Sequence, residues 1–236
     1  MIAPGWYGKI PSTGDFVARR VAPAFSEAWD RWLLGAFKAS RERLGAAWQE
    51  AYLCMPAWRF VLSPGALTQD AWAGVMVPSV DTVGRVFPLT VVAALPAASV
   101  DPVATLFSAA AWFDGIEAVA LGAIAPDTHA TEIDDELKQL VLRAEWIAPR
   151  AASDHDIREW MLSIPMPPRT PDERAPAGLQ VRAGPRSAWL AEECEVLGRS
   201  LLFCRPLPGA AQYCALMDGR WLEHGWSRRD LEAERA

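Results

Sequence analysis

Residues 72–95 read WAGVMVPSVDTVGRVFPLTVVAAL, and this stretch carries most of the information about the fold. Its two ends, WAGVMVPS and VFPLTVVAAL, are apolar at nearly every position, which is typical of strands covered on both faces. Between them lie Ser79, Asp81 and Gly84, which are turn-forming residues. The segment WRFVLS, residues 58–63, precedes them as a further strand. Because the connections are short, residues 58–95 predict a three-stranded antiparallel meander.

Upstream of the meander, WYGKI and FVARR are predicted as two short extended segments on either side of a turn at Gly14. Pro23 then begins an amphipathic helix, because apolar residues recur at the spacing of one helix face. The residues of this stripe are Phe25, Trp29, Trp32, Leu33, Ala36 and Phe37. Leu44, Trp48 and Tyr52 either continue this helix or form a second one after Gly45. We interpret these aromatic residues as core.

Downstream, Asp101 and Pro102 predict the N-cap and first turn of a helix that runs to about Gly122. Residues 127–146 predict a second helix with a buried stripe of Ile133, Leu137, Leu140 and Val141, and residues 153–162 a short third one. Five prolines within residues 164–180 indicate a loop, and we regard it as a candidate partner contact. Three strands are expected near the end, at residues 187–191, 200–204 and 211–217.

These elements predict an α+β fold, with a mainly antiparallel central sheet flanked by helices on both faces in a sandwich-like α/β/α arrangement. We expect residues 1–125 to form an N-terminal region of sheet and helices. Residues 126–236 are expected to form a C-terminal α/β region that supplies the later strands and completes the same compact unit.

The composition is that of a globular protein with a substantial core, since 51% of its 236 residues are hydrophobic and 22% are charged. The formal net charge of −6 and the pI near 5.2 argue against nucleic-acid binding, which requires a clustered basic surface. The N-terminus has no basic region followed by an apolar run, and no stretch matches about 20 uninterrupted apolar residues. We therefore expect a cytoplasmic protein without membrane insertion.

The segment GKIPSTGDF, residues 8–16, contains several residue types of a phosphate-binding loop. It does not match that motif, because Ile10 follows Gly8-Lys9 where a hydroxyl is needed and Ala3 stands where the first glycine belongs. Pro11 also removes a backbone N–H donor. The segment is more typical of a turn, in which Gly14 is free to adopt positive φ and Asp15 is able to bond back to the chain.

Cys194, Cys204 and Cys214 follow one another at intervals of ten residues, and His224 continues the interval. This spacing leaves a zinc site of three cysteines and one histidine conceivable. Structural zinc sites, however, draw their ligands in pairs two to four residues apart, and no such pair occurs here. The favoured interpretation is that these cysteines are small apolar residues of buried strands.

Recognisable catalytic motifs are absent from the sequence: there is no G-x-S-x-G, H-E-x-x-H, C-x-x-C or G-x-G-x-x-G. His129 and His224 have no evident partners. The carboxylate runs at Asp134–Glu136 and Glu192–Glu193 are expected on solvated surfaces. We therefore predict a protein that is not an enzyme and has no cofactor, although a catalytic site assembled from distant residues remains an alternative.

Several segments together resemble the TagF family of proteins associated with bacterial type VI secretion. They are GWYGKIPSTGDFVARR, WDRWL, AYLCMPAWRFVL, WAGVMVPSVDTVGRVFPLT and the closing LMDGRW. The similarity covers residues 5–96 and, more loosely, Asp218–Trp221. From it we expect residues 1–125 to be a TagF-like N-terminal region. It implies a cytosolic accessory protein that represses the secretion apparatus after translation. It also implies a protein partner, the forkhead-associated protein Fha of the same system.

Candidate partner-binding residues lie in the two polar turns of this region: Ser12, Asp15, Ser79, Asp81 and Arg85. Loops between strands commonly carry binding residues, and Asp15 would pair with Arg85 if the two loops converge. The favoured interpretation of such a pair is structural, because residues that hold tight turns and residues that bind partners look alike in one sequence. Besides a repressor, an enzyme with a non-standard active site and a structural piece of the secretion assembly remain alternatives.

Overall fold

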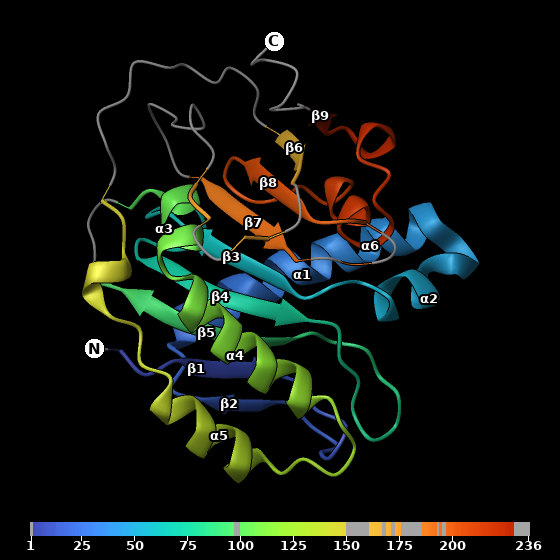
Figure 1. The fold of residues 1–236 in the computed structure, drawn as a ribbon. Coiled ribbons are helices and arrows are strands. Elements are labelled where there is room, and N and C mark those ends of the chain that lie inside the picture. Colours follow the sequence, from blue (N-terminus) through green and yellow to red (C-terminus); the bar gives the residue numbers. More distant parts are fainter. Residues whose placement is uncertain are drawn as a thin grey trace.

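The computed structural model describes residues 2–96, 100–149, 161–166, 169–170, 173–175, 186–192, 194 and 197–228. Within these residues nine strands form one sheet in the order β2-β1-β5-β4-β3-β7-β8-β6-β9, and helices cover both of its faces (Figure 1). Neighbouring strands are antiparallel throughout, except that β6 and β9 are parallel. The predicted α+β fold with a mainly antiparallel sheet is confirmed.

The strands are β1 (Gly5–Gly8), β2 (Val17–Arg19), β3 (Trp58–Leu62), β4 (Ala71–Val77), β5 (Leu89–Leu95), β6 (Met161–Pro165), β7 (Ser187–Ala191), β8 (Ser200–Cys204) and β9 (Ser227–Arg228). The meander of β3, β4 and β5 is confirmed, with Phe60 opposite Gly74 and Gly74 opposite Val92. Gly74 is required there, because a Cβ would lie 2.2 Å from the Val91 carbonyl oxygen and 2.8 Å from the Phe60 ring. β5 begins at Leu89, because residues 86–88 belong to the connection.

The helices are α1 (Pro23–Leu44), α2 (Trp48–Leu53), α3 (Pro102–Ser108), α4 (Ala110–Ala123), α5 (Ala130–Gln139) and α6 (Ala215–Asp218), with single 3₁₀ turns η1 (Gly45–Ala47), η2 (Ala144–Trp146), η3 (Gln212–Cys214) and η4 (Leu222–His224). α1 begins at Pro23 as predicted, and Gly45 ends it with a φ of 54°. The chain then turns into the separate helix α2, which resolves the alternative left open by the sequence.

The helix predicted from Asp101 to about Gly122 is two helices. Asp101 caps α3 as expected and accepts a hydrogen bond from the Ala104 N–H. The chain bends by 79° between α3 and α4, so that α3 covers β3 and β7 while α4 covers β4 and β5. One straight helix would not follow the sheet in this way. Among the described residues no single helix is long and apolar enough to span a membrane, and only this bent pair meets those criteria jointly.

The second predicted helix is shorter than expected. α5 ends at Gln139, with Ile133 and Leu137 buried, whereas Leu140 and Val141 lie beyond its end. The chain leaves the helix there because Leu142 forms a β-bridge with Ile2. The helix predicted over residues 153–162 is wrong at its end, since Met161 and Leu162 belong to β6, and the rest lies outside the described residues.

The loop predicted over residues 164–180 begins later than expected, because Ile164 and Pro165 are part of β6, and much of the remainder lies outside the described residues. The strand predicted over residues 211–217 is wrong: the segment forms η3 and α6. Its carbonyl of Leu216 accepts a hydrogen bond from the Trp58 indole. A short apolar run fits a buried helical turn as well as a strand, so periodicity alone does not separate them.

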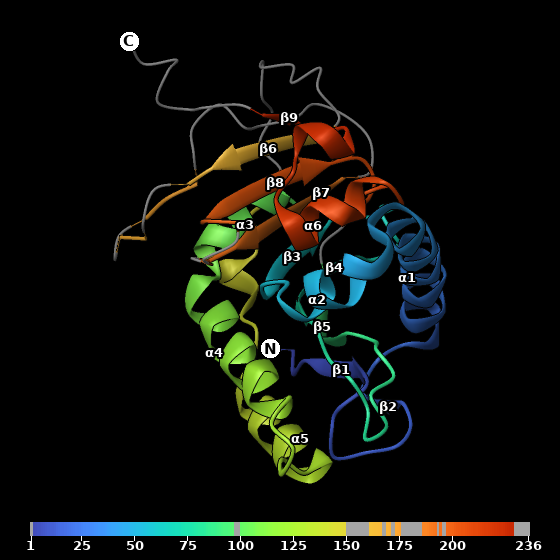
Figure 2. The same cartoon turned by 90° about the vertical axis from the view of Figure 1, so that its right-hand side faces the viewer.

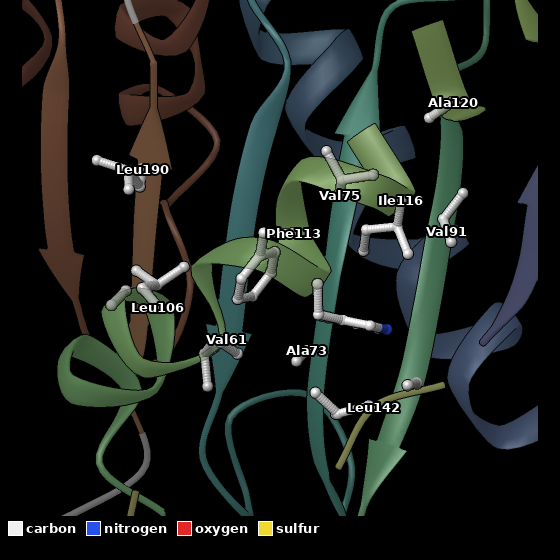
Figure 3. Close-up of a cluster of buried hydrophobic side chains, with 14 of the residues drawn as sticks. Val61, Ala73, Val75, Val91, Leu106, Phe113, Ile116, Ala120, Leu142 and Leu190 are labelled. Carbon is white, nitrogen blue, oxygen red and sulfur yellow. The ribbon is translucent and has the colours of Figure 1, made fainter. Parts of the chain in front are cut away.

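Two buried clusters lie on the two faces of the sheet, as the edge-on view in Figure 2 shows. On one face α3, α4 and α5 pack onto the strands, and Figure 3 shows Phe113 and Ile116 of α4 directed at β4 and β5. On the other face α1, α2 and α6 enclose an aromatic cluster that includes Trp29, Phe60 and Trp189. Helices on both faces, as predicted, leave the loops at the ends of the strands as exposed surfaces.

Candidate functional site

Two loops meet at one end of the sheet. Residues 9–16 join β1 to β2, and residues 78–88 join β4 to β5. Because β1 pairs with β5, both loops leave the sheet side by side. The approach is close: Gly8 has a φ of 140°, and a Cβ there would lie 2.2 Å from the Pro88 carbonyl oxygen. We call residues 9–16 and 78–88 the loop pair.

The carboxylate of Asp81 is the centre of the loop pair. Its Oδ2 accepts hydrogen bonds from Lys9 Nζ at 2.8 Å and from Arg85 Nε at 2.7 Å. Its Oδ1 accepts from the backbone N–H of Val83 at 3.1 Å and of Arg85 at 2.8 Å. The Asp81 side chain is fully buried, whereas that of Arg85 is 61% exposed. One carboxylate therefore holds its own turn and binds the neighbouring loop through Lys9.

Burial by itself would raise the pKa of Asp81, but the hydrogen bonds from Lys9 and Arg85 outweigh it and hold that pKa well below its ordinary value. The group is ionised at neutral pH. A buried carboxylate that accepts four hydrogen bonds is suited to fixing backbone geometry and is a poor general acid.

Three further contacts join the two loops. Ser79 Oγ donates to the Lys9 carbonyl at 2.7 Å, the Thr82 N–H donates to the Thr13 carbonyl at 3.1 Å, and Arg85 Nη2 donates to the Gly14 carbonyl at 2.6 Å. Each contact ends on backbone of the first loop. The two loops therefore form one surface that is held in place from beneath.

The outer side of the loop pair presents apolar side chains. Val83 is 71% exposed and Phe16 is 44% exposed. The Phe16 ring packs edge-on against Phe87, with centroids 4.7 Å apart, and stacks on Tyr7 at 5.7 Å. Lys9 Nζ lies 5.1 Å from the Phe16 centroid, within range of a cation–π contact. Sequence reasoning missed Phe16 and Val83 as members of this surface, and it missed Lys9 as the buried cation beneath it that binds Asp81.

The candidate residues from the sequence divide into buried and outward-facing ones. Ser79 and Asp81 are buried and hold the loops, so neither side chain is accessible to a partner. Asp15 and Arg85 are exposed, but they do not pair with each other: Arg85 binds Asp81 and the Gly14 carbonyl, and Asp15 accepts from the Phe16 N–H. Ser12 Oγ is buried, and none of the residues that the structure describes forms a hydrogen bond with it. The two loops do converge, which was the condition for a pair between Asp15 and Arg85, but Arg85 forms its ion pair with Asp81 instead.

A second charged group lies on the face covered by α4, and we call it the Arg59 cluster. Arg59 of β3 binds Glu117 at 2.5 Å, Asp114 at 2.9 Å and Glu192 at 3.2 Å. The cluster is extended by Arg199, which binds Glu173 and Glu192, and by Arg169, which binds Asp114. A charged residue in an otherwise apolar strand was the signal for this cluster in the sequence.

The carboxylates of the cluster are paired with arginines. Burial works to raise the pKa of Asp114, but Arg169 and Arg59 outweigh it and lower that pKa. The expectation of solvated carboxylates is therefore wrong for Glu192. It is wrong for Asp134 as well, which accepts a hydrogen bond from the Trp6 indole and pairs with Arg20. Carboxylates that cations keep ionised are poorly suited to donate protons at neutral pH.

The residues of the conceivable zinc site have other neighbours. The Cys204 Sγ lies 3.0 Å from Ser187 Oγ, and burial raises the pKa of the Cys204 thiol to about 12. His224 Nε2 lies 2.9 Å from Asp218 Oδ2. Throughout the part of the chain that the structure describes, no three His, Cys, Asp or Glu side chains gather as metal ligands would.

The described geometry defines an α+β protein with a two-faced core, a fixed loop pair and carboxylates engaged in ion pairs. Residues 5–140 match the family model of the TagF N-terminal domain, described as type VI secretion system-associated. This range is more than half of the chain. The chain belongs to the TagF family of type VI secretion system-associated proteins, as its sequence motifs indicated.

A solved structure is similar to this chain over nearly its whole length. The chain is 31% identical to PA0076 from Pseudomonas aeruginosa PAO1, whose crystal structure it matches with a TM-score of 0.73. The match covers 92% of this chain and 94% of that one, so the similarity extends beyond the N-terminal domain. No curated protein matches the chain.

Proposed function

We propose that this chain is a cytoplasmic accessory protein that represses a type VI secretion system after translation. It acts by binding the forkhead-associated protein Fha of the same system, and it catalyses no reaction. Membership of the TagF family supports the link to type VI secretion. The resemblance noted in the sequence supports the repressor role and the choice of partner.

The loop pair is the surface that we assign to this binding. The observation that carries the assignment is Val83, an aliphatic side chain 71% exposed at the tip of a loop that the buried Asp81 carboxylate holds in place. An apolar group on a preorganised surface loses little conformational entropy on binding. Phe16 and the exposed side chain of Arg85 extend the surface, and both phenylalanine and arginine are enriched at protein–protein interfaces.

Deletion of the gene from its own bacterium tests the repressor role. Loss of a repressor raises the amount of secreted type VI substrate, and re-expression of the chain lowers it again. If the chain is instead a structural piece of the assembly, deletion lowers secretion, and that result contradicts the proposal. The transcript levels of the secretion genes serve as the control, because repression after translation leaves them unchanged.

Co-purification tests the partner. Tagged chain is expected to retain Fha from lysate, and the purified pair is expected to form a complex in size-exclusion chromatography. An enzyme would behave differently: a substitution in its active site would abolish repression while Fha binding persists. Substitutions on the loop pair are expected to remove binding and repression together.

A further inference from the structure

The loop pair by itself offers a partner only a small surface. Seven of its residues are exposed, and they form the tips of the two loops at residues 14–16 and 82–85. A stable protein–protein interface engages about 20 to 30 residues on each side. A partner of the loop pair therefore also contacts neighbouring segments at the same end of the sheet.

The C-terminal end of α2 lies at this end of the sheet. Residues 54–57 join α2 to β3, and β3 begins at Trp58, which is opposite Met76 near the end of β4. The connection before β3 and the loop after β4 therefore leave the sheet on the same side. Figure 2 shows α2 and both loops on the side of the molecule that faces the viewer.

Tyr52 attaches α2 to the loop pair. Tyr52 is fully buried, and its hydroxyl accepts a hydrogen bond from the Ser79 N–H and donates one to the Ser79 carbonyl, each at 3.1 Å. Ser79 in turn donates to the Lys9 carbonyl of the other loop. The end of α2 is thus held against the loop pair, so the residues that follow Tyr52 are preorganised together with it.

Exposed apolar side chains gather at this end of the sheet. Six large hydrophobic side chains are exposed in the part of the chain that the structure describes, and three of them are Phe16, Val83 and Leu53. The other three lie on separate elements, α1, α4 and η4. Leu53 is 49% exposed, and Cys54 after it is exposed as well. Grouped exposed apolar residues mark interaction surfaces, whereas single ones are ordinary.

The same surface carries a cation in a fixed orientation. Lys9 and Arg85 share the single carboxylate of Asp81, and Asp15, the other acidic residue of the loop pair, pairs with neither of them. Arg85 is the exposed cation of the two. Its Nε and Nη2 are held by Asp81 and by the Gly14 carbonyl, whereas Nη1 bonds to no residue that the structure describes. Such a guanidinium is suited to pair with a carboxylate of a partner.

We infer that Fha docks on one face made of the loop pair and the C-terminal end of α2, which we call the docking face. Phe16, Val83 and Leu53 are its apolar contacts, and Arg85 is its charged contact. This inference rests on the proposed function and deepens it. It adds α2 to the contact surface, and it specifies the chemistry of the partner: an apolar patch that carries a carboxylate opposite Arg85.

Binding of purified Fha, measured by calorimetry, tests the docking face with matched variants whose Tm values are compared first. Leu53→Glu places a charge on α2, and Leu121→Glu places the same charge on α4 at a similar exposure of 45%. Leu53→Glu should weaken binding at least about fivefold, and Leu121→Glu should leave it unchanged. Arg85→Gln should weaken binding a few-fold and reduce its salt dependence, whereas Arg31→Gln, at an exposed position of α1, should do neither.

Cys54 provides a measurement that requires no substitution. Its thiol is exposed beside Leu53, so iodoacetamide should modify it readily in the free chain. In the complex with Fha the alkylation rate of Cys54, followed by peptide mass spectrometry, should fall at least about tenfold, because the contacts around it exclude solvent. An unrelated protein at the same concentration should leave the rate unchanged.

Wild-type affinity of Leu53→Glu would overturn the inference, and so would an alkylation rate of Cys54 that Fha leaves unchanged. Equal effects of Arg85→Gln and Arg31→Gln would overturn the charged contact. If Val83→Glu weakens binding while Leu53→Glu does not, the proposed function stands and this inference alone fails. If the wild-type chain does not bind Fha, the proposed function fails and the inference fails with it.

Discussion

The loop pair and the Arg59 cluster each hold one buried charge that is paired with side chains of opposite charge, and the buried charge is negative in the loop pair and positive in the Arg59 cluster. In the loop pair a buried carboxylate, Asp81, is surrounded by the cations of Lys9 and Arg85. In the Arg59 cluster a buried guanidinium is surrounded by three carboxylates, from Asp114, Glu117 and Glu192. Both charges are taken out of water, which is costly unless each is paired and hydrogen-bonded.

The two sites differ in whether water can reach the charged partners that remain when the central charge is removed. Lys9 is buried and would remain without a counter-ion, and two backbone N–H groups would lose a charged acceptor. The carboxylates around Arg59 are partly exposed, with side chains between 16% and 42% accessible, so water can reach them. Removal of the central charge should therefore destabilise the folded chain more in the loop pair than in the Arg59 cluster.

Asp81→Asn is expected to have the largest effect on stability. An asparagine keeps the shape but leaves the Lys9 ammonium unpaired in a buried position, and we expect the Tm to fall by roughly 10 °C. Differential scanning calorimetry measures it. Asp15→Asn, an exposed change in the neighbouring loop, should leave the Tm within about 2 °C of the wild type. Equal shifts for both variants would contradict the central role of Asp81.

Arg59→Met should have an intermediate effect. Methionine fills part of the volume, and the three carboxylates regain hydration once the cation is gone, so we expect a fall in Tm of roughly 5 °C. Differential scanning calorimetry measures the fall in Tm of Arg59→Met, which is then compared with the fall in Tm of Asp81→Asn. A fall larger than that of Asp81→Asn would show that solvent access to the partners does not determine the ranking.

The pH dependence of the free energy of unfolding separates the contribution of the Asp81 carboxylate from the contributions of other residues. Its pKa is lower in the folded chain than the ordinary 3.8, so its contribution is fully present above that value and is lost as the pH falls toward the folded pKa. The stability difference between wild type and Asp81→Asn should stay constant from pH 7 to about pH 5 and narrow below about pH 4. Urea unfolding at each pH measures it. A difference that persists unchanged to pH 3 would contradict this assignment.

Arg85→Ala should have the smallest effect on stability. The Arg85 side chain is largely exposed, and exposed ion pairs contribute little, so we expect the Tm to change by at most about 2 °C. Lys9 continues to pair with Asp81 in this variant. The measurement is again calorimetric, and a fall as large as that of Asp81→Asn would mean that Arg85, and not Lys9, holds the loops together.

Local patterns were enough to predict much of the fold. The meander follows from runs that are apolar on both faces, and the start of α3 follows from an Asp-Pro pair, because both signals lie within a few residues. The segment 211–217 was assigned to the wrong class because a short apolar run does not distinguish a strand from a buried helical turn. The bend between α3 and α4 depends on the sheet beneath and leaves no local signal.

The candidate site was less predictable, because its contacts are long-range. Lys9 and Asp81 are 72 residues apart in the sequence, and Arg59 and Asp114 are 55 apart. Turn-forming residues identified both loops correctly, but nothing local indicates that Ser79 and Asp81 point inward while Val83 points outward. That distinction requires the pairing of β1 with β5, which brings the loops together.

The binding of purified Fha by two matched variants tests the central claim most directly. Val83→Glu places a charge on the tip of the loop pair, and Leu34→Glu places the same charge on α1 at a position with 63% exposure. Both side chains can remain solvated, so the Tm of each should match that of the wild type. We expect Val83→Glu to weaken Fha binding at least about tenfold in calorimetry, and Leu34→Glu to leave it unchanged. Binding of Val83→Glu at wild-type affinity would contradict the assignment of the loop pair as the partner surface.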